Sequence, residues 1–303
     1  MKLLIIRFST LGDIVLASPL VRSLRKAYPD AEIHFLTTEA NRSAVEFNPY
    51  INKLQVHAQS RELMIEELRP ENYDQIIDLQ GDGLSLSVSR ELHSKPLSIN
   101  SKSFLARLSG LLGNQGGNIV DRYFNAVRSL KLTNDGAGLD YFISPHEETK
   151  KNDIPASHFA GYIACALDAR KGWSTTTWKD FCVQMDHPII LLGGKEYANA
   201  AREIASADDI KIYNACGKFS INETADLIRK SKLLVCNGSD FMQVAAAFKR
   251  PIITIWDNKT TPVKPNPYYG SSYLSGNPDK PYDILSLAKT SVNDLLAAVK
   301  KRL

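Results

Sequence analysis

The sequence predicts an α/β protein of two Rossmann-like domains, each a parallel sheet covered by helices. Short apolar segments alternate with stretches of helical periodicity along the whole chain, as they do in βαβ units. These segments are apolar on both faces, which is typical of strands in parallel sheets. A polar segment rich in Gly, Asn and charge, 131–155, interrupts the alternation and predicts a linker between domains 1–145 and 146–303.

The first domain is expected to alternate strands and helices and then to add two helical stretches. Apolar runs predict the strands, and apolar spacing of helical period predicts the helices. Pro19 either kinks the first helix or, with Ser18 as cap, opens a second one. The expected strands are 2–8, 32–37, 53–56, 75–79 and 96–99, and the expected helices are 13–27, 39–46, 61–69, 83–91, 102–112 and 118–131.

The second domain repeats the alternation. Ser220 and Glu223 form a capping box, which supports the helix that follows them. A last helix near 291–302 is expected to pack back toward the first domain. Ligands bind at the carboxyl ends of strands in open parallel sheets, so we expect the site in a central cleft between the facing domains. The expected strands are 162–167, 188–192, 210–213, 233–236 and 252–255, and the other expected helices are 175–185, 196–206, 220–231 and 240–249.

Composition excludes several classes of protein. Apolar residues make up 44% and charged residues 23% of the 303 residues, as in globular proteins. The net charge of +4 is spread along the chain without basic-aromatic interleaving, so no nucleic-acid partner is expected. The four cysteines form no CxxC pair and are expected to be buried free thiols. The sequence has no signal segment and no membrane-spanning run, which predicts a cytoplasmic protein that can still touch the inner membrane surface.

The first turn that carries chemistry is Ser9–Thr10–Leu11–Gly12–Asp13. It follows a buried strand and opens a helix, like a nucleotide-binding turn, but it has one glycine and an acid. A fixed carboxylate at a helix start repels a phosphate. Asp13 is therefore either a first-turn acid, worth about 1 kcal/mol of helix stability, or a carboxylate that takes a proton from a substrate hydroxyl.

Two stretches of the second domain suit a phosphorylated ligand. Gly193 and Gly194 leave a strand just before Glu196 and allow a ligand to approach the backbone closely. Arg170 and Lys171 lie in a loop after a strand, where basic groups would neutralise a diphosphate. A tight turn and an ordinary exposed loop explain the same residues without a ligand.

A third stretch runs from a strand through Gly238 and Ser239 into an Ala-rich helix. Ser239 is a natural N-cap, and this helix start suits a phosphate better than the turn at Asp13. Asp240 in the first turn would compete with a bound anion.

Taken together, these stretches resemble the lipopolysaccharide heptosyltransferases of glycosyltransferase family 9 over nearly the whole chain. The most specific match is the opening segment "IIRFSTLGDIVLASPLVRSLRKAYPDAEIHFL". In the family's order there follow "NYDQIIDLQG" at 72–81, "KGW" at 171–173, "ILLGGKE" at 190–196 and "AAAFKRPIITIWDN" at 245–258.

This resemblance implies a GT-B fold, with an acceptor-binding first domain and a nucleotide-sugar-binding second domain. It implies transfer of heptose from an ADP-sugar to a lipid-linked glycan of the cell envelope, with inversion, without a metal and without a cofactor beyond the donor. Asp13 takes the position of the family's general base. The site residues so implied are Asp13 as catalytic base; Ser9, Thr10, Gly12 and Gln80 on the acceptor side; and Lys171, Gly194, Glu196, Gly238, Ser239, Asp240 and Gln243 on the donor side.

The donor motif departs from the family's pattern, which reads Asp-Thr-Gly with a His three residues after the Gly. Aligned without gaps, this chain has Gly238, Ser239, Asp240 and Gln243. The acid that contacts the sugar is thus missing, and a carboxylate stands where the glycine approaches the diphosphate. We therefore expect ADP-heptose to bind weakly unless Lys259 or Lys264 compensates.

Two functions from different classes follow from the sequence. The first is a heptosyltransferase-type glycosyltransferase, which Asp13 favours. The alternative is a non-catalytic relative that keeps the fold and binds a nucleotide, glycan or protein partner, which the altered donor motif favours. A nucleotide-sugar epimerase or another dinucleotide enzyme would need a GxGxxG turn after a strand, and the sequence has none.

Overall fold

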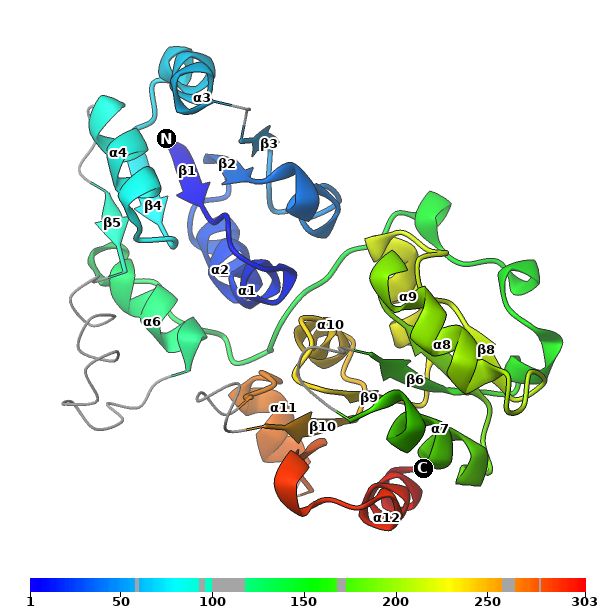
Figure 1. The fold of residues 1–303 in the computed structure, drawn as a ribbon. Helices are drawn as coiled ribbons and strands as arrows, with labels where there is room; N and C mark the ends of the chain where they lie inside the picture. The colour runs from blue at the N-terminus through cyan, green and yellow to red at the C-terminus, as the bar shows by residue number, and fades with distance from the viewer. Residues whose placement is uncertain (58–59, 93–95, 100–117, 168–172, 258–264, 278) are drawn as a thin grey trace. The chain divides into compact units, whose positions relative to one another are not determined.

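The computed structural model describes residues 1–57, 60–92, 96–99, 118–167, 173–257, 265–277 and 279–303 (Figure 1). The chain divides into two compact units, Met1–Phe142 and Ile143–Leu303. The expected helix 102–112 lies outside the described residues.

Unit 1 contains a parallel sheet with the strand order β3-β2-β1-β4-β5. The central strand β1 pairs through Ile5 with Phe35 on one side and Ile77 on the other. Its inner residues are fully buried because strands flank it on both sides and helices cover its faces. The strands are β1 (Lys2–Ile6), β2 (Glu32–Thr37), β3 (Lys53–Val56), β4 (Gln75–Asp78) and β5 (Leu97–Ser98).

The expected helix 13–27 is two helices, α1 (Leu11–Leu16) and α2 (Ser18–Ala27). Pro19 thus opens a second helix, because its ring fits the first turn. Ala17 is the N-cap, whereas Ser18 donates its hydroxyl back to the Val15 carbonyl. The other helices are α3 (Arg61–Leu68), α4 (Gly83–Glu91) and α6 (Ile119–Ala126), with 3-10 turns η1 (Glu39–Ala44), η2 (Arg69–Glu71) and η3 (Arg128–Leu130).

Unit 2 contains a second parallel sheet with the order β11-β10-β9-β6-β7-β8. The edge strand β11 was not expected from the sequence. All five of its residues are half-buried, so it lacks the apolar run that marks the other strands. The strands are β6 (Ile163–Ala166), β7 (Ile189–Leu192), β8 (Ile212–Asn214), β9 (Leu233–Cys236), β10 (Ile252–Trp256) and β11 (Tyr282–Ser286).

The helices of unit 2 include α9, whose capping box of Ser220 and Glu223 is confirmed. The α-helices are α7 (Thr175–Gln184), α8 (Ala198–Ala205), α9 (Ile221–Lys230), α10 (Phe241–Ala247), α11 (Ser271–Gly276) and α12 (Val292–Arg302). The 3-10 turns are η4 (Pro145–Glu147), η5 (Lys151–Asp153), η6 (Ala156–His158), η7 (Lys195–Tyr197) and η8 (Leu287–Lys289).

The C-terminal helix α12 packs within unit 2, against α7. Leu295 and Val299 are fully buried in the same apolar cluster as Trp178 and Phe181 of α7, and Figure 1 shows α12 beside α7. A nearby apolar face within unit 2 accepts the apolar stripe of the helix.

A buried carboxylate fastens the start of unit 2 to α9. The side chain of Asp226 is fully buried and accepts hydrogen bonds from the backbone N–H and hydroxyl of Thr149, at 2.8 and 2.7 Å. Lys230 Nζ lies 2.6 Å away, and Arg229 donates from Nε at 2.9 Å. Burial acts to raise the pKa of Asp226, but the bonds from Lys230, Thr149 and Arg229 outweigh it and lower that pKa.

All four cysteines are buried and free, as the sequence predicts. Burial raises the pKa of the thiols of Cys182 and Cys216 to about 12. Within the described segments, no helix is both long and apolar enough to cross a bilayer.

Candidate functional site

Asp13 lies in the first turn of α1, just beyond the carboxyl end of β1. Its side chain is 29% exposed. Two donors converge on one oxygen: the Ser9 hydroxyl lies 2.6 Å and Arg7 Nη2 lies 2.9 Å from Asp13 Oδ2. No described residue hydrogen-bonds to the other oxygen, Oδ1. The carboxylate is therefore held through Oδ2, and its side chain is partly exposed.

The Arg7 guanidinium is itself fixed from several directions. Its side chain is 9% exposed. Nη1 donates to the Leu79 carbonyl at 2.6 Å, at the carboxyl end of β4, and the guanidinium lies over the ring of Tyr123 on α6, 5.8 Å from the centroid. Burial raises the pKa of Tyr123, so this neighbour stays neutral. Arg7 thus links the turn after β1 to β4 and α6.

Two amides from neighbouring loops hold the backbone ahead of Asp13. Gln80 accepts a hydrogen bond from the Phe8 N–H at 3.1 Å and donates to Asp82 at 2.9 Å. Asn41 donates to the Ser9 carbonyl at 2.5 Å. The parallel order β2-β1-β4 brings these loops to the same edge of the sheet. The predicted residues Ser9, Asp13 and Gln80 therefore lie in one constellation.

The loop that carries Gln80 is shaped by a fully buried acid, Asp78. Its Oδ1 accepts from the backbone N–H groups of Gln80 and Gly81, at 2.9 and 2.8 Å, and its Oδ2 accepts from the Ser85 hydroxyl at 3.0 Å. Burial raises the pKa of Asp78, and the three hydrogen bonds partly offset that rise.

The other two predicted residues of the turn serve the helix. Thr10 is the N-cap of α1, and its carbonyl accepts from the Ile14 N–H. Gly12 is buried in the first turn of α1.

On the donor side, Gly194 and Glu196 lie together in the turn after β7. Gly194 is the N-cap of η7 with ordinary φ of −71°, and both residues are exposed. A Cβ at Gly194 would meet the Glu196 carboxylate, which is a flexible group. The turn is thus open, and its conformation does not require glycine at position 194.

The turn after β9 does use a glycine. Gly238 has φ of +70° and donates its N–H to the Thr254 hydroxyl at 3.0 Å. The Ser239 hydroxyl accepts from the Phe241 N–H at 3.2 Å, at the start of α10. Asp240 is exposed at that start and follows the turn directly. Asp240, and not Ser239 as the sequence suggests, is therefore the N-cap of α10, and its carboxylate stands at the helix start rather than in the first turn.

Gln243 is the predicted donor residue whose side-chain amide is engaged at both ends. It is buried, its amide nitrogen donates to the Asn266 carbonyl at 3.1 Å, and its amide oxygen accepts from the Tyr268 N–H at 3.1 Å. Both ends of the amide therefore hold the chain at 266–268. Lys171, Lys259 and Lys264 lie outside the described residues.

Sequence reasoning missed Arg7, Asn41 and Asn237. Arg7 carried a signal, because a charged residue directly after an apolar strand needs a partner when it is buried. Asn237 follows β9, is 4% exposed, and has no hydrogen-bond partner in the described segments for either amide atom. Nothing in the spacing of Asn41 or Asn237 marked them.

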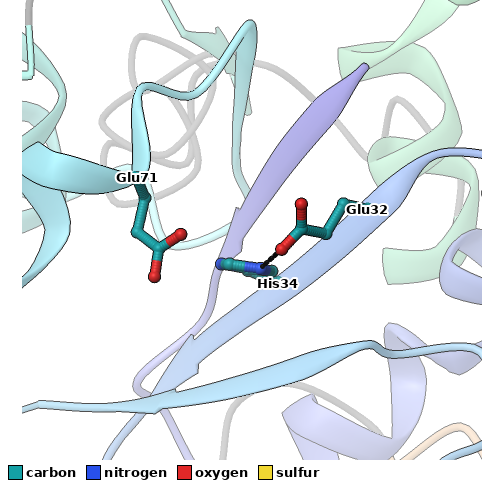
Figure 2. A group of neighbouring side chains, drawn as sticks. All are labelled: Glu32, His34 and Glu71. Carbon is teal, nitrogen blue, oxygen red and sulfur yellow. Dashed lines mark hydrogen bonds and ion pairs between the residues drawn. The ribbon is translucent and has the colours of Figure 1, made fainter.

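One further cluster, in unit 1, has the composition of a metal site. Glu32, His34 and Glu71 place ligand atoms within 4.8 Å of one another, and Figure 2 shows the contact between His34 and Glu32. Lys2 Nζ lies 2.8 Å from Glu71 and 3.3 Å from Glu32, and Lys53 also pairs with Glu71. Hydrogen bonds from the two lysines lower the pKa of Glu71 to about 2. The arrangement is therefore an ion-pair network in which ammonium groups already neutralise the carboxylates.

Comparison with known proteins shows the family to which the chain belongs. The family model of glycosyltransferase family 9 (heptosyltransferase) matches residues 61–282. Lipopolysaccharide heptosyltransferase 1 of Campylobacter coli is 27% identical over 292 residues, which cover 84% of each chain. Lipopolysaccharide heptosyltransferase 3 of Escherichia coli is 24% identical over 276 residues, covering 81% of this chain and 80% of the relative.

Solved structures confirm the predicted GT-B fold class. A family 9 glycosyl transferase from Veillonella parvula superposes with a TM-score of 0.79 at 18% identity, covering 99% of this chain and 96% of its own. The E. coli ADP-heptose lipopolysaccharide heptosyltransferase II superposes with a TM-score of 0.77 at 19% identity, covering 100% and 98%.

Proposed function

Because the chain belongs to glycosyltransferase family 9, we propose that it transfers heptose or a related sugar from a nucleotide-sugar to a lipopolysaccharide or other cell-envelope glycan. The carrying observation is the carboxylate of Asp13, held at Oδ2 by Ser9 and Arg7 with Oδ1 left without a partner among the described residues. A helix-capping acid needs no such pair of donors on one oxygen. The arrangement suits a general base toward a hydroxyl.

The proposed step is a single displacement. The acceptor hydroxyl oxygen attacks the anomeric carbon of the donor while Asp13 takes the hydroxyl proton. The bond from the anomeric carbon to the phosphate oxygen breaks, and the nucleoside diphosphate leaves with the electron pair. Attack from the face opposite the leaving group inverts the anomeric configuration. The proposed mechanism uses neither a metal nor a further cofactor.

The donor is proposed to be an ADP-sugar, bound by a site that differs from the family's. Asp240 adds a carboxylate to the start of α10, and an anion near a diphosphate opposes its binding. Both ends of the Gln243 amide hydrogen-bond to the backbone at 266–268, so these groups are already engaged within the chain. We therefore propose that ADP-heptose binds weakly and that a related sugar is the better donor.

The location follows from the acceptor. A lipid-linked glycan is presented at the inner face of the inner membrane, so we propose a cytoplasmic protein with peripheral contact at that surface.

The second candidate is a relative that binds a ligand or partner without catalysis. The engaged amide of Gln243 and the exposed Asp240 favour it. Such a relative would keep the fold, and this second candidate therefore predicts ligand binding without turnover.

The test uses purified protein with ADP-heptose, other ADP-sugars and UDP-sugars, and heptose-deficient lipopolysaccharide as acceptor. Mass spectrometry of the acceptor measures transfer, and calorimetric titration measures donor binding. We expect transfer that Asp13→Asn abolishes while donor affinity stays unchanged, because only proton abstraction is lost. Transfer by Asp13→Asn refutes the base, and binding without transfer favours the second candidate.

A further inference from the structure

We propose that Arg7 is a positioning residue that fixes Asp13 through Oδ2, so that Oδ1 is the atom that takes the acceptor proton. This inference rests on the proposed function and adds to it a residue and an atom. It follows from three features of unit 1: the convergence of donors on one oxygen, the anchoring of the guanidinium, and an unpartnered atom of Arg7.

The convergence selects one carboxylate oxygen. Arg7 Nη2 and the Ser9 hydroxyl both reach Asp13 Oδ2, at 2.9 and 2.6 Å. An oxygen that accepts two hydrogen bonds, one of them from a cation, is a poorer proton acceptor than its neighbour. Proton transfer is therefore directed to Oδ1.

The contacts that anchor the Arg7 guanidinium also fix the position of the Asp13 carboxylate. The guanidinium is held by the Leu79 carbonyl at 2.6 Å and by the ring of Tyr123, and its own side chain is 9% exposed. It therefore has little freedom to follow a moving carboxylate. Asp13, at 29% exposure, is the partner that would otherwise adopt several rotamers.

The hydrogen bonding of Arg7 is incomplete in a way that a purely structural role does not explain. Its Nε is buried and has no hydrogen-bond partner in the described segments. An unpaired buried donor is unfavourable. The orientation of the guanidinium thus allows Nη2 to contact Asp13 and Nη1 to donate to the Leu79 carbonyl, while Nε is left without a partner among the described residues.

The experiment compares Arg7→Met, Arg7→Lys and Ser9→Ala with a matched control, Arg22→Met. Arg22 is also buried and paired with carboxylates, Asp135 and Asp140, but it has no contact with Asp13. Near-UV circular dichroism first establishes that each variant is folded. Initial rates with ADP-heptose, or with whichever donor of the panel supports transfer, and heptose-deficient lipopolysaccharide then give kcat and KM.

We expect Arg7→Met to lower kcat by about 10–100-fold, because a base displaced by about 1 Å loses a rate factor of that order. KM for the donor should change by less than about threefold, because the proposal gives Arg7 no contact with the donor. Arg7→Lys keeps a point charge without the planar fork and should recover part of the loss. Ser9→Ala removes one neutral donor and should lower kcat by about 2–10-fold.

The outcomes separate this inference from the proposed function. If Asp13→Asn is inactive but Arg7→Met lowers kcat no more than Arg22→Met does, the positioning role is wrong and the base remains. If Arg7→Met does not fold, the kcat values of Arg7→Lys and Ser9→Ala decide: both equal to wild type would overturn the inference. Transfer by Asp13→Asn, or no transfer by wild-type protein with any donor of the panel, overturns the proposed function and this inference together.

Discussion

Two glycines of unit 2, Gly238 and Gly217, have nearly the same backbone conformation but different surroundings, and alanine at each should separate two costs. Their φ values are +70° and +71°. A Cβ at Gly238 has Pro265 Cγ as its near neighbour at 3.8 Å, an ordinary contact. A Cβ at Gly217 would lie 2.9 Å from Lys195 Cα, a backbone atom that cannot move aside cheaply. Among the described residues, only those around the second site add a steric cost.

The left-handed conformation destabilises the folded state of an L-residue by about 1–2 kcal/mol. Alanine also lowers the conformational entropy of the unfolded chain relative to glycine, which stabilises the protein by about 0.4–1 kcal/mol. Gly238→Ala should therefore lower the free energy of unfolding by about 1 kcal/mol. Gly217→Ala should lower the free energy of unfolding by about 1–3 kcal/mol more than Gly238→Ala does, because the added methyl group overpacks the site. Urea unfolding followed by tryptophan fluorescence measures both, because Trp173, Trp178 and Trp256 all lie in unit 2. Equal losses at the two sites would refute the reasoning.

This comparison makes the donor motif testable. The space at Gly238 means that Gly238→Asp should fold, at a cost near that of alanine. The double variant Gly238→Asp with Asp240→Gly restores the family's order of acid and glycine, and we expect it to bind ADP more tightly than wild type in calorimetric titration. Unchanged or weaker ADP binding would show that these two positions do not limit the donor site.

Three further predictions concern unit 2. Asp226→Asn should lower the free energy of unfolding by about 1–3 kcal/mol at pH 7, because it weakens the hydrogen bonds to a buried carboxylate, while Lys230 and Arg229, more than a third exposed, can return to water. The folded-state pKa of Asp226 is lowered, so this difference should hold above the unfolded pKa of about 3.9 and vanish as pH falls through the folded pKa in urea titrations. Gln243→Ala should speed hydrogen exchange at the Tyr268 amide, which loses its acceptor, while leaving exchange in β9 unchanged; equal protection of Tyr268 would contradict the assigned role. Buried thiols with raised pKa values should make the native protein nearly inert to a thiol reagent at pH 8, with four thiols reacting after denaturation; fast native labelling would contradict their burial.

The sheets could be predicted from the sequence because their strands are buried on both faces. Such strands read as short apolar runs, and ten of the eleven strands in the described part of the chain begin or end close to a predicted range. The exception, β11, is half-buried at a sheet edge, so its residues alternate too weakly to be recognised. The sequence left two possibilities open at the end of α1, because Pro19 is compatible with a kink in one helix or with the start of a second helix, and the packing decides between them.

The site could be predicted only in part. The position of Asp13 follows from a strand–turn–helix pattern that is local in sequence. The partners of Asp13 and Gln243 are not all local: Arg7 depends on the Leu79 carbonyl of another strand, and Gln243 on the backbone at 266–268. A residue type shows what hydrogen bonds it can make, but only the fold shows which of them are already used.

The unpaired buried groups support the location of the site at the carboxyl edges of the sheets. Folded proteins leave few buried polar atoms without a partner. In the described segments such atoms include Arg7 Nε just after β1, the Thr37 hydroxyl at the end of β2 and both amide atoms of Asn237 just after β9. Each of these residues ends or follows a strand at the edge where open parallel sheets bind ligands. Two other described residues with such atoms lie elsewhere: the Tyr123 hydroxyl is on α6, and Arg250 Nε lies just before the amino end of β10. Three of these five described residues therefore lie at the edge where the family fold places its chemistry, whereas the amino ends of β1 and β2 carry ion pairs of Lys2 with Glu71 and Glu32.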